Sequence, residues 1–364
     1  MMRLLKRVAQ LVEWLCHEIE LRRIRKHELE SEDDHLTLEE ITGLRKFRRK
    51  GFSAFDAHLY NLDKGNDFRE YITTWEAYQP AFTNNTKFWA ISSNKYLFYL
   101  VYSRFIDTPK VHMSIRNGKI QWLERDNDTD VYDFILKNNG AVLKDTFGCD
   151  GNKVWVFVPS PQGLVCRDEV WDKRRLLEVV SGLSFAILQD RAIQGTFANS
   201  LYENSINTVR MITMRKKGSY EHEVVAALIR IGTNCSAPTD NCSQGGGSCL
   251  INLETGELGP MRTYFDKDEH GRFIAMDTHP DTGAQITGRV IPNWSKVKQT
   301  IIDLTNKIYF FETLAWDIVL MDDGIQVIET NLKSSLSIFQ IHGPMRNSLL
   351  GEKYREHGWL VDEK

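Results

Sequence analysis

The chain has 364 residues, of which 42% are hydrophobic and 26% are charged, and its formal net charge is −3 at pH 7. This composition is typical of a globular protein with room for two or three lobes. The small negative charge disfavours a nucleic-acid-binding protein held by phosphate contacts. No apolar run is long enough to predict a transmembrane segment or a signal peptide, so we expect a cytoplasmic protein.

Residues 1–85 are predicted to form a mainly helical N-terminal region. Apolar residues recur at helical spacing through residues 3–27, and the end of that segment is basic. Such a helix can make peripheral contact with an anionic membrane. Packing on its own domain or on a second subunit, which would make the protein an oligomer, is the favoured alternative because the stripe is largely aliphatic. Thr37, followed by Glu39 and Glu40, predicts the start of a second helix.

Helices and strands alternate in the next part of the chain. We predict a capped helix within residues 92–102, two short strands joined by an Asn117-Gly118 turn, a helix at 130–138, two strands with a glycine-bearing loop at 140–157, a helix at 167–181 and a strand at 184–189.

Strands are again predicted at 207–215 and 223–231, and a glycine-rich stretch follows at 240–247. A connection at 286–294 leads to a long helix at 296–312 and a hairpin at 314–328 whose turn ends at Gly324. Hairpins outnumber parallel crossovers, so the predicted fold class is α+β, with antiparallel sheets flanked by helices.

Three cysteines in this second half, Cys235, Cys242 and Cys249, are evenly spaced. No pair has the short separation of zinc ligands, and no histidine is close in sequence, so we predict free thiols and no zinc site.

The predicted hairpin brings polar side chains to one end of an apolar pair of strands. A three-residue loop would pair Met321 with Ile325 and place Asp317 opposite Glu329, whereas a two-residue loop would put them on opposite faces. Asn331 shares a face with Glu329 because side chains alternate along a strand. Three hard oxygen ligands suit Mg²⁺, which prefers carboxylates together with substrate phosphates. The alternative is an ordinary solvated strand end.

Four cations are candidates for a phosphate site. Lys144 precedes a loop with small residues at which backbone amides could approach a phosphate, although a lysine beside a glycine turn is common in plain hairpins. Lys95 gives a weaker signal. Arg210 and Arg230 lie within apolar strands, where a guanidinium must face a carboxylate, a phosphate or a cleft. Structural ion pairs would satisfy them equally well. Taken together with the oxygen ligands, the four cations indicate a polyanion site with Mg²⁺.

The order of motifs from about residue 87 to residue 357 resembles the ATP-grasp superfamily, and in particular its sugar-transfer-associated group. The motifs are Asn-Lys-Tyr, Val-Leu-Lys, Ile-Leu-Gln-Asp, Ser-Ile-Asn-Thr-Val-Arg, Asp-Asn with a glycine run, His-Pro-Asp-Thr-Gly, Ile-Pro-Asn-Trp, Trp-Asp-Ile-Val and Ile-Glu-Thr-Asn. The resemblance implies an ATP-grasp fold in which two α/β lobes with antiparallel sheets clamp a nucleotide. Residues 86–190 would form the nucleotide-binding lobe, and residues 191–364 the catalytic lobe with the Mg²⁺ and acceptor sites.

The resemblance also implies a role for each matching residue. The cofactors would be ATP and Mg²⁺. The flap carries fewer glycines than in many members. The implied roles are phosphate contacts for Lys95 and Lys144; a flap at Phe147, Gly148 and Gly151; the adenine and ribose side for Gln189 and Asp190; Mg²⁺ ligation by Asp317, Glu329 and Asn331; contact with the transferred phosphoryl group by Arg210 and Arg230; and the acceptor side for Asp240, Asn241, Gly245, Gly246, His279 and Asp281.

The activity implied by the resemblance is ATP-dependent ligation of a carboxylate to an amine through an acyl phosphate. The partners would be small molecules, either a surface-polysaccharide precursor or an amino-acid metabolite. One alternative is a kinase that leaves the phosphoryl group on its product. A second alternative is a non-catalytic nucleotide-binding scaffold.

Overall fold

The computed structural model describes residues 26, 29–30, 36–84, 88–124, 130–148 and 153–360. The chain divides into two compact units, one made of Met1–Gln79 with Ser335–Lys364 and the other of Pro80–Ser334. Of the helix expected at 3–27, only the residue at position 26 belongs to the described part. Gly151 lies outside the described residues.

The first unit is helical. Thr37 begins α2 with a capping box, since its hydroxyl accepts from the Glu40 backbone N–H at 3.3 Å and the Glu40 carboxylate accepts from the Thr37 N–H at 2.8 Å. This confirms the helix start predicted at Thr37. The buried Asp56 carboxylate accepts from the Ser337 hydroxyl at 2.6 Å, which ties the C-terminal residues to the N-terminal ones. The helices are α2 (Leu38–Arg48), α3 (Ala54–Leu59), α4 (Thr74–Thr83, which crosses the unit boundary), α11 (Ser337–Gln340) and α12 (Leu349–His357).

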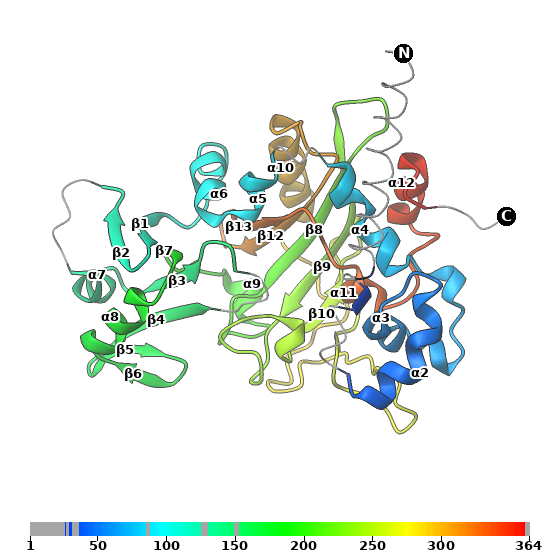
Figure 1. Ribbon diagram of the computed structural model, residues 1–364, viewed down its shortest axis with the longest axis horizontal. Coiled ribbons are helices and arrows are strands. Elements are labelled where there is room, and N and C mark those ends of the chain that lie inside the picture. Colours follow the sequence, from blue (N-terminus) through cyan, green and yellow to red (C-terminus); the bar gives the residue numbers. More distant parts are fainter. Residues whose placement is uncertain are drawn as a thin grey trace, which may run out of the picture. The chain divides into compact units, whose positions relative to one another are not determined.

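The second unit contains two antiparallel sheets (Figure 1). The first sheet has seven strands in the order β2-β1-β7-β3-β4-β5-β6. Two helices precede its strands along the chain, α5 (Trp89–Ser93) and α6 (Lys95–Tyr102), and both contribute to the apolar cluster of the second sheet. The strands and the other helices of this stretch are β1 (Val111–Arg116), β2 (Lys119–Trp122), α7 (Val131–Lys137), β3 (Ala141–Asp145), β4 (Val154–Ser160), β5 (Gly163–Cys166), β6 (Glu169–Trp171), α8 (Lys173–Ser181) and β7 (Phe185–Gln189).

The second sheet has six strands in the order β11-β10-β9-β8-β12-β13. Every strand pairing in both sheets is antiparallel, which confirms the predicted α+β class. Its elements are α9 (Thr196–Asn199), β8 (Thr208–Arg215), β9 (His222–Ile231), β10 (Gly247–Leu250), β11 (Arg262–Thr263), α10 (Trp294–Lys307), β12 (Thr313–Leu320) and β13 (Ile325–Asn331).

The capped helix predicted within residues 92–102 is α6. Its cap is Asn94, whose side chain accepts from two backbone N–H groups, and Ser92 lies inside α5. The boundaries of two other predicted elements are wrong. The helix predicted at 167–181 begins only at Lys173, because Arg167 and Asp168 take positive φ angles and turn β5 back into β6. The long helix ends at Lys307, and β12 starts at Thr313.

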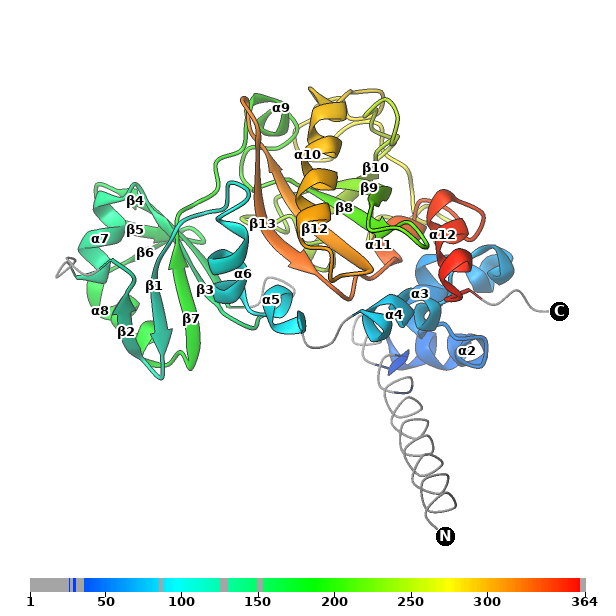
Figure 2. The ribbon, with the colours of Figure 1, turned by 90° about the horizontal axis from the view of Figure 1, so that it is seen from above.

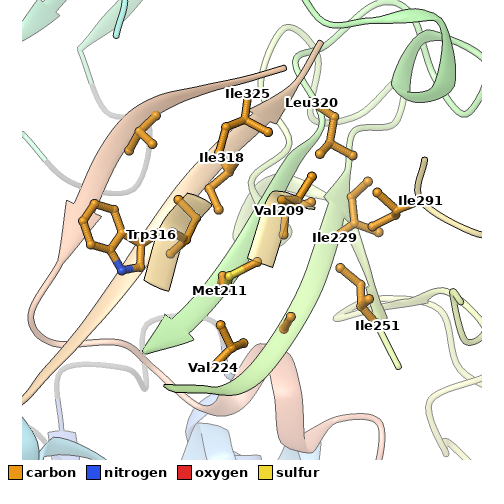
Figure 3. Close-up of a cluster of buried hydrophobic side chains, with 14 of the residues drawn as sticks. Val209, Met211, Val224, Ile229, Ile251, Ile291, Trp316, Ile318, Leu320 and Ile325 are labelled. Atoms are coloured by element: carbon orange, nitrogen blue, oxygen red, sulfur yellow. The ribbon is translucent and has the colours of Figure 1, made fainter. Parts of the chain in front are cut away.

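A large apolar cluster supports the second sheet. Helix α10 lies along one face of that sheet (Figure 2), and it contributes Trp294, Val297, Ile301 and Leu304 to the cluster. Strand residues from β8, β9, β12 and β13 fill the same layer (Figure 3). Trp316 is fully buried there, and its indole N–H donates to the Thr213 hydroxyl at 2.9 Å. Burial of this face fixes the register that sets which residues point to the opposite side.

Candidate nucleotide and metal site

The β12–β13 hairpin places Asp317 directly opposite Glu329, as the sequence predicted. The predicted loop is wrong, because Leu320, not Met321, pairs with Ile325. A β-bulge between Asp317 and Ile318 shifts the register by one residue and restores the Asp317–Glu329 pair. Bulges are common next to functional sites because they redirect side chains.

Asp317 forms the centre of a charged cluster on the second sheet. Its carboxylate accepts from Nη2 of Arg210 at 2.9 Å and also from Nε of Arg210, and Nη2 of Arg230 donates to it at 3.1 Å. Asn331 adjoins the same carboxylate, with its amide nitrogen 3.5 Å from Oδ2. Burial disfavours the ionised form of Asp317, but the two guanidinium groups outweigh it and lower the pKa of the carboxyl.

Arg230 has a second set of partners that the sequence did not indicate. Its Nε and Nη2 donate to the Thr208 hydroxyl oxygen at 3.0 Å and 2.6 Å. Thr208 in turn donates to the Asp240 carboxylate, which lies 3.4 Å from the Arg230 Nε. Burial alone would lower the pKa of the Arg230 guanidinium, but Asp240 and Asp317 raise it above its usual value. Arg230 therefore stays charged while buried.

Two lysines converge on the same place, Lys144 from a strand of the first sheet and Lys95 from helix α6. Lys144 lies on β3 and is 7% exposed, and burial lowers its pKa to about 8 even though Glu329 acts in the opposite direction. Lys95 opens α6, and its ammonium is 3.7 Å from the Glu329 carboxylate. The structure thus brings together Lys95, Lys144 and Glu329, which are far apart in the sequence.

The segment that follows β3 is hydrogen-bonded to Lys95. The Lys95 ammonium donates to the Gly148 carbonyl, and its backbone N–H donates to the Thr146 carbonyl at 3.0 Å. Phe147 is 56% exposed and packs edge-on against Phe185, with ring centroids 5.7 Å apart. The first residues of the expected flap therefore lie beside Lys95.

The expected adenine side lies at the end of β7. Gln189 is buried, and it pairs with Val111 on β1 and with Val142 on β3, so it lies between two strands in the interior of the sheet. The Asp190 Oδ1 is hydrogen-bonded to His112 Nε2 and to the Asn138 amide, each at 2.7 Å. Burial would raise the pKa of Asp190, but these two bonds lower it, and the carboxylate is ionised. Among the described residues no bond to Oδ2 is present, which leaves that oxygen for a hydroxyl group.

A cavity of about 810 Å³ adjoins this strand end. Its wall includes Asp190, Arg191 and Gln194, and residues of the β12–β13 turn complete it. The cavity is large enough to receive a nucleoside.

The residues expected on the acceptor side have mostly internal partners. His279 is 1% exposed, its Nε2 lies 2.7 Å from the Gly232 carbonyl, and its Nδ1 accepts from the Asp281 and Thr282 backbone N–H groups. Both ring nitrogens are thus used by the backbone, and the expected acceptor contact of His279 has no support. The Asp281 carboxylate accepts from the Asn234 N–H at 2.8 Å, so it too holds a loop in place.

The glycine-rich stretch is also internally constrained. The Asn241 side chain accepts from the backbone N–H and hydroxyl of Ser243, which forms the 3₁₀ turn Cys242–Gln244. A side chain at Gly245 would meet Cys235 at 2.7 Å, and one at Gly246 would meet the Asp240 carbonyl at 2.6 Å. Close packing of the loop explains these two glycines without a ligand.

The oxygen donors fit a hard divalent cation only in part. Within the described residues no group of three His, Cys, Asp or Glu side chains could hold a metal ion. Asp317, Glu329 and Asn331 supply two carboxylates and one amide at the hairpin end, which is the donor chemistry of Mg²⁺. However, the Asp317 oxygens already accept hydrogen bonds from two guanidinium groups. A metal ion here would have to share Asp317 with Arg210 and Arg230.

The charge balance explains what the site can bind. Lys95, Lys144, Arg210 and Arg230 bring four positive charges, whereas Asp240, Asp317 and Glu329 bring three negative ones. The cluster is therefore net positive, so it attracts a polyanion more readily than a bare metal ion.

None of the helices in the described part of the chain is both long and apolar enough to cross a membrane.

Comparison with solved structures gives distant matches. The D-alanine–D-alanine ligase from Bacillus anthracis is 14% identical, with 76% of this chain and 65% of that chain covered and a TM-score of 0.35. The ATP-grasp ligase PsnB, complexed with precursor peptide PsnA2 and AMPPNP, is 12% identical, with coverages of 75% and 60% and a TM-score of 0.38. The ADP complex of purK, N5-carboxyaminoimidazole ribonucleotide synthetase, is 13% identical, with coverages of 73% and 51% and a TM-score of 0.41.

The chain spans less than two thirds of the length of each of these three proteins. No curated protein matches it in a sequence comparison. A sequence-family profile, in contrast, matches residues 76–352, which is most of the chain. The motif order, the two antiparallel sheets and the profile agree, and the chain belongs to the sugar-transfer associated ATP-grasp family.

Proposed function

We propose that the chain is an ATP-dependent ligase that joins a carboxylate to an amine through an acyl phosphate. The observation that carries the proposal is the cluster around Asp317 and Glu329, on which two lysines and two arginines converge. Within the described residues, Nη1 of Arg210 and Nη1 of Arg230 make no hydrogen bond. These donors are available to a phosphoryl group.

The nucleotide phosphates would occupy the space between the lysines and the hairpin. Lys144 and Lys95 would hold the phosphate chain, and the segment at Phe147 and Gly148 would cover it. Asp190 would accept from a ribose hydroxyl through Oδ2. In this assignment residues 86–190 form the nucleotide-binding lobe, and residues 191–364 supply the metal and acceptor sides.

Glu329, Asn331 and Asp317 would hold Mg²⁺. When bound, the ion neutralises charge on the phosphate oxygens and aligns them for displacement. Mg²⁺ fits these residues only when the nucleotide phosphates act as additional ligands, because the side-chain cluster alone is net positive.

In the first step, a carboxylate oxygen of the substrate would attack the γ-phosphorus, and the bond to the bridging oxygen of ADP would break. In the second step, the amine nitrogen would attack the acyl carbon and lose a proton, and inorganic phosphate would leave. Arg210 and Arg230 would stabilise charge on the transferred group through their Nη1 donors. No side chain needs to act as nucleophile, because the substrate carboxylate does so.

The family description favours a surface-polysaccharide precursor as substrate, and a small amino-acid metabolite is the other candidate. The partners are thus a small carboxylic acid and a small amine, and we place the reaction in the cytoplasm.

The test is a product assay with purified protein, Mg·ATP and panels of sugar acids, amino acids and amines. Phosphorus NMR follows the phosphate, and mass spectrometry identifies the product. We expect ADP, free phosphate and a condensed amide in equal amounts. A stable phosphorylated product would show a kinase instead, and no nucleotide turnover with any pair would show a non-catalytic scaffold. Either result would overturn the proposal.

A further inference from the structure

Asp240 and Thr208 together hold one edge of the Arg230 guanidinium. Asp240 was expected on the acceptor side, yet its closest partners are Thr208 and Arg230. We infer that Thr208 and Asp240 are positioning residues, which fix Arg230 for contact with the transferred phosphoryl group. This inference rests on the proposed function.

The Thr208 hydroxyl has its full set of hydrogen bonds. It donates to Asp240 Oδ2 at 2.5 Å and accepts from Nε and Nη2 of Arg230. A hydroxyl group has one proton to donate and two lone pairs, so no capacity remains for another ligand. Its proton must point at Asp240, and both lone pairs must face Arg230.

Asp240 is itself fixed. Its Oδ2 also accepts from the Thr208 backbone N–H at 2.9 Å, and the residue is 8% exposed. The backbone contact places the carboxylate at the start of β8, beside the guanidinium that it must neutralise. Because Oδ2 of Asp240 is bonded to Thr208 and lies 3.4 Å from Nε of Arg230, we assign Asp240 the role of positioning Arg230 and not that of contacting the acceptor.

The arrangement gives Arg230 an anchor that does not depend on Asp317. Arg210 is held through Asp317 alone among the bonds described, whereas Arg230 is held by Asp317 and by Thr208. If a metal ion takes part of the Asp317 carboxylate, Arg230 keeps its orientation through Thr208 and Asp240. Nη1 of Arg230, which has no hydrogen bond within the described residues, then stays available to the phosphoryl group.

The experiment measures calorimetric affinities for two probes, Mg·ADP and Mg·AMP-PNP, and takes their ratio as the γ-phosphoryl preference. We expect Thr208→Val and Asp240→Ala to bind Mg·ADP as the wild type does. Their γ-phosphoryl preference should fall about tenfold, which is the size of effect expected when a hydrogen bond to a charged group is lost. Thr208→Ser retains the hydroxyl and should keep the preference. Arg230→Ala should lose it, and adding Thr208→Val to Arg230→Ala should change nothing further.

An unchanged preference in Thr208→Val and Asp240→Ala would overturn the inference. So would additive losses in the double variant, because they would mean that Thr208 or Asp240 acts on the ligand directly. A wild-type protein that binds neither probe would contradict the proposed function itself. The two failures are therefore distinguishable. If Thr208→Val does not fold, Asp240→Ala combined with Arg230→Ala gives the same cycle.

Discussion

Nucleotide affinity should fall steeply above pH 8 because of Lys144. Burial lowers the pKa of this ammonium to about 8, and the groups facing it are Glu329, Lys95 and Asp317. Bound phosphates favour the charged form and would raise the pKa again. Binding is therefore linked to uptake of a proton wherever the free protein has lost it.

The magnitude follows from that pKa. At pH 7 Lys144 is mostly charged in the free protein, and at pH 9 it is mostly neutral. If the complex keeps the lysine charged across this range, the affinity for Mg·ADP falls about tenfold from pH 7 to pH 9, and binding at pH 8 takes up about half a proton.

Titration calorimetry in buffers of different ionisation enthalpy measures both quantities. Lys144→Arg stays charged, so its affinity should be flat with pH and its proton uptake absent. Lys144→Met should bind weakly at every pH. An equally steep pH dependence in Lys144→Met would refute the reasoning, because the titrating group would then lie elsewhere.

Three further outcomes follow from the same contacts. Mn²⁺ alone should show little binding by electron paramagnetic resonance, because Arg210 and Arg230 are hydrogen-bonded to Asp317 and the cluster is net positive. Addition of AMP-PNP should allow Mn²⁺ to bind, whereas tight binding of Mn²⁺ alone would contradict this expectation. Asp317→Ala leaves two buried guanidinium groups without this carboxylate, so it should lower the free energy of unfolding in urea by about 3–5 kcal/mol. The control Asp323→Ala, at the exposed hairpin turn, should change the free energy of unfolding little. His279→Ala should cost about 1–3 kcal/mol of stability but leave Mg·AMP-PNP affinity unchanged, since within the described part of the chain its ring nitrogens bond only the backbone. Lost affinity at unchanged stability would indicate instead that His279 contacts the ligand.

Local patterns in the sequence predicted much of the fold. Apolar runs marked the strands at 207–215 and 223–231, and the Asn-Gly turn between β1 and β2 has both residues at positive φ. The β5–β6 hairpin was missed because Arg167 and Asp168 are unusual at positive φ and no glycine marks the turn.

The site was predictable where charge appears in an apolar strand. Arg210 and Arg230 stood out for this reason, and they do face a carboxylate. The Asp317–Glu329 pair was reached from an incorrect loop, since a bulge cannot be read from alternation alone. Thr208 belongs to one of the family motifs, but it drew no prediction of its own because a threonine at the start of a strand is ordinary. Its function depends on tertiary contacts with Asp240 and Arg230.

The most direct test of the central claim is isotope exchange within ATP. The assay uses ATP labelled with oxygen-18 in the β,γ-bridge, the carboxylate that supports product formation, and no amine. Reversible formation of an acyl phosphate frees the β-phosphate to rotate, so the label should move to a non-bridging position. This movement should require the carboxylate and disappear in Glu329→Gln. A label that stays in the bridge while the complete reaction proceeds would contradict the acyl-phosphate account.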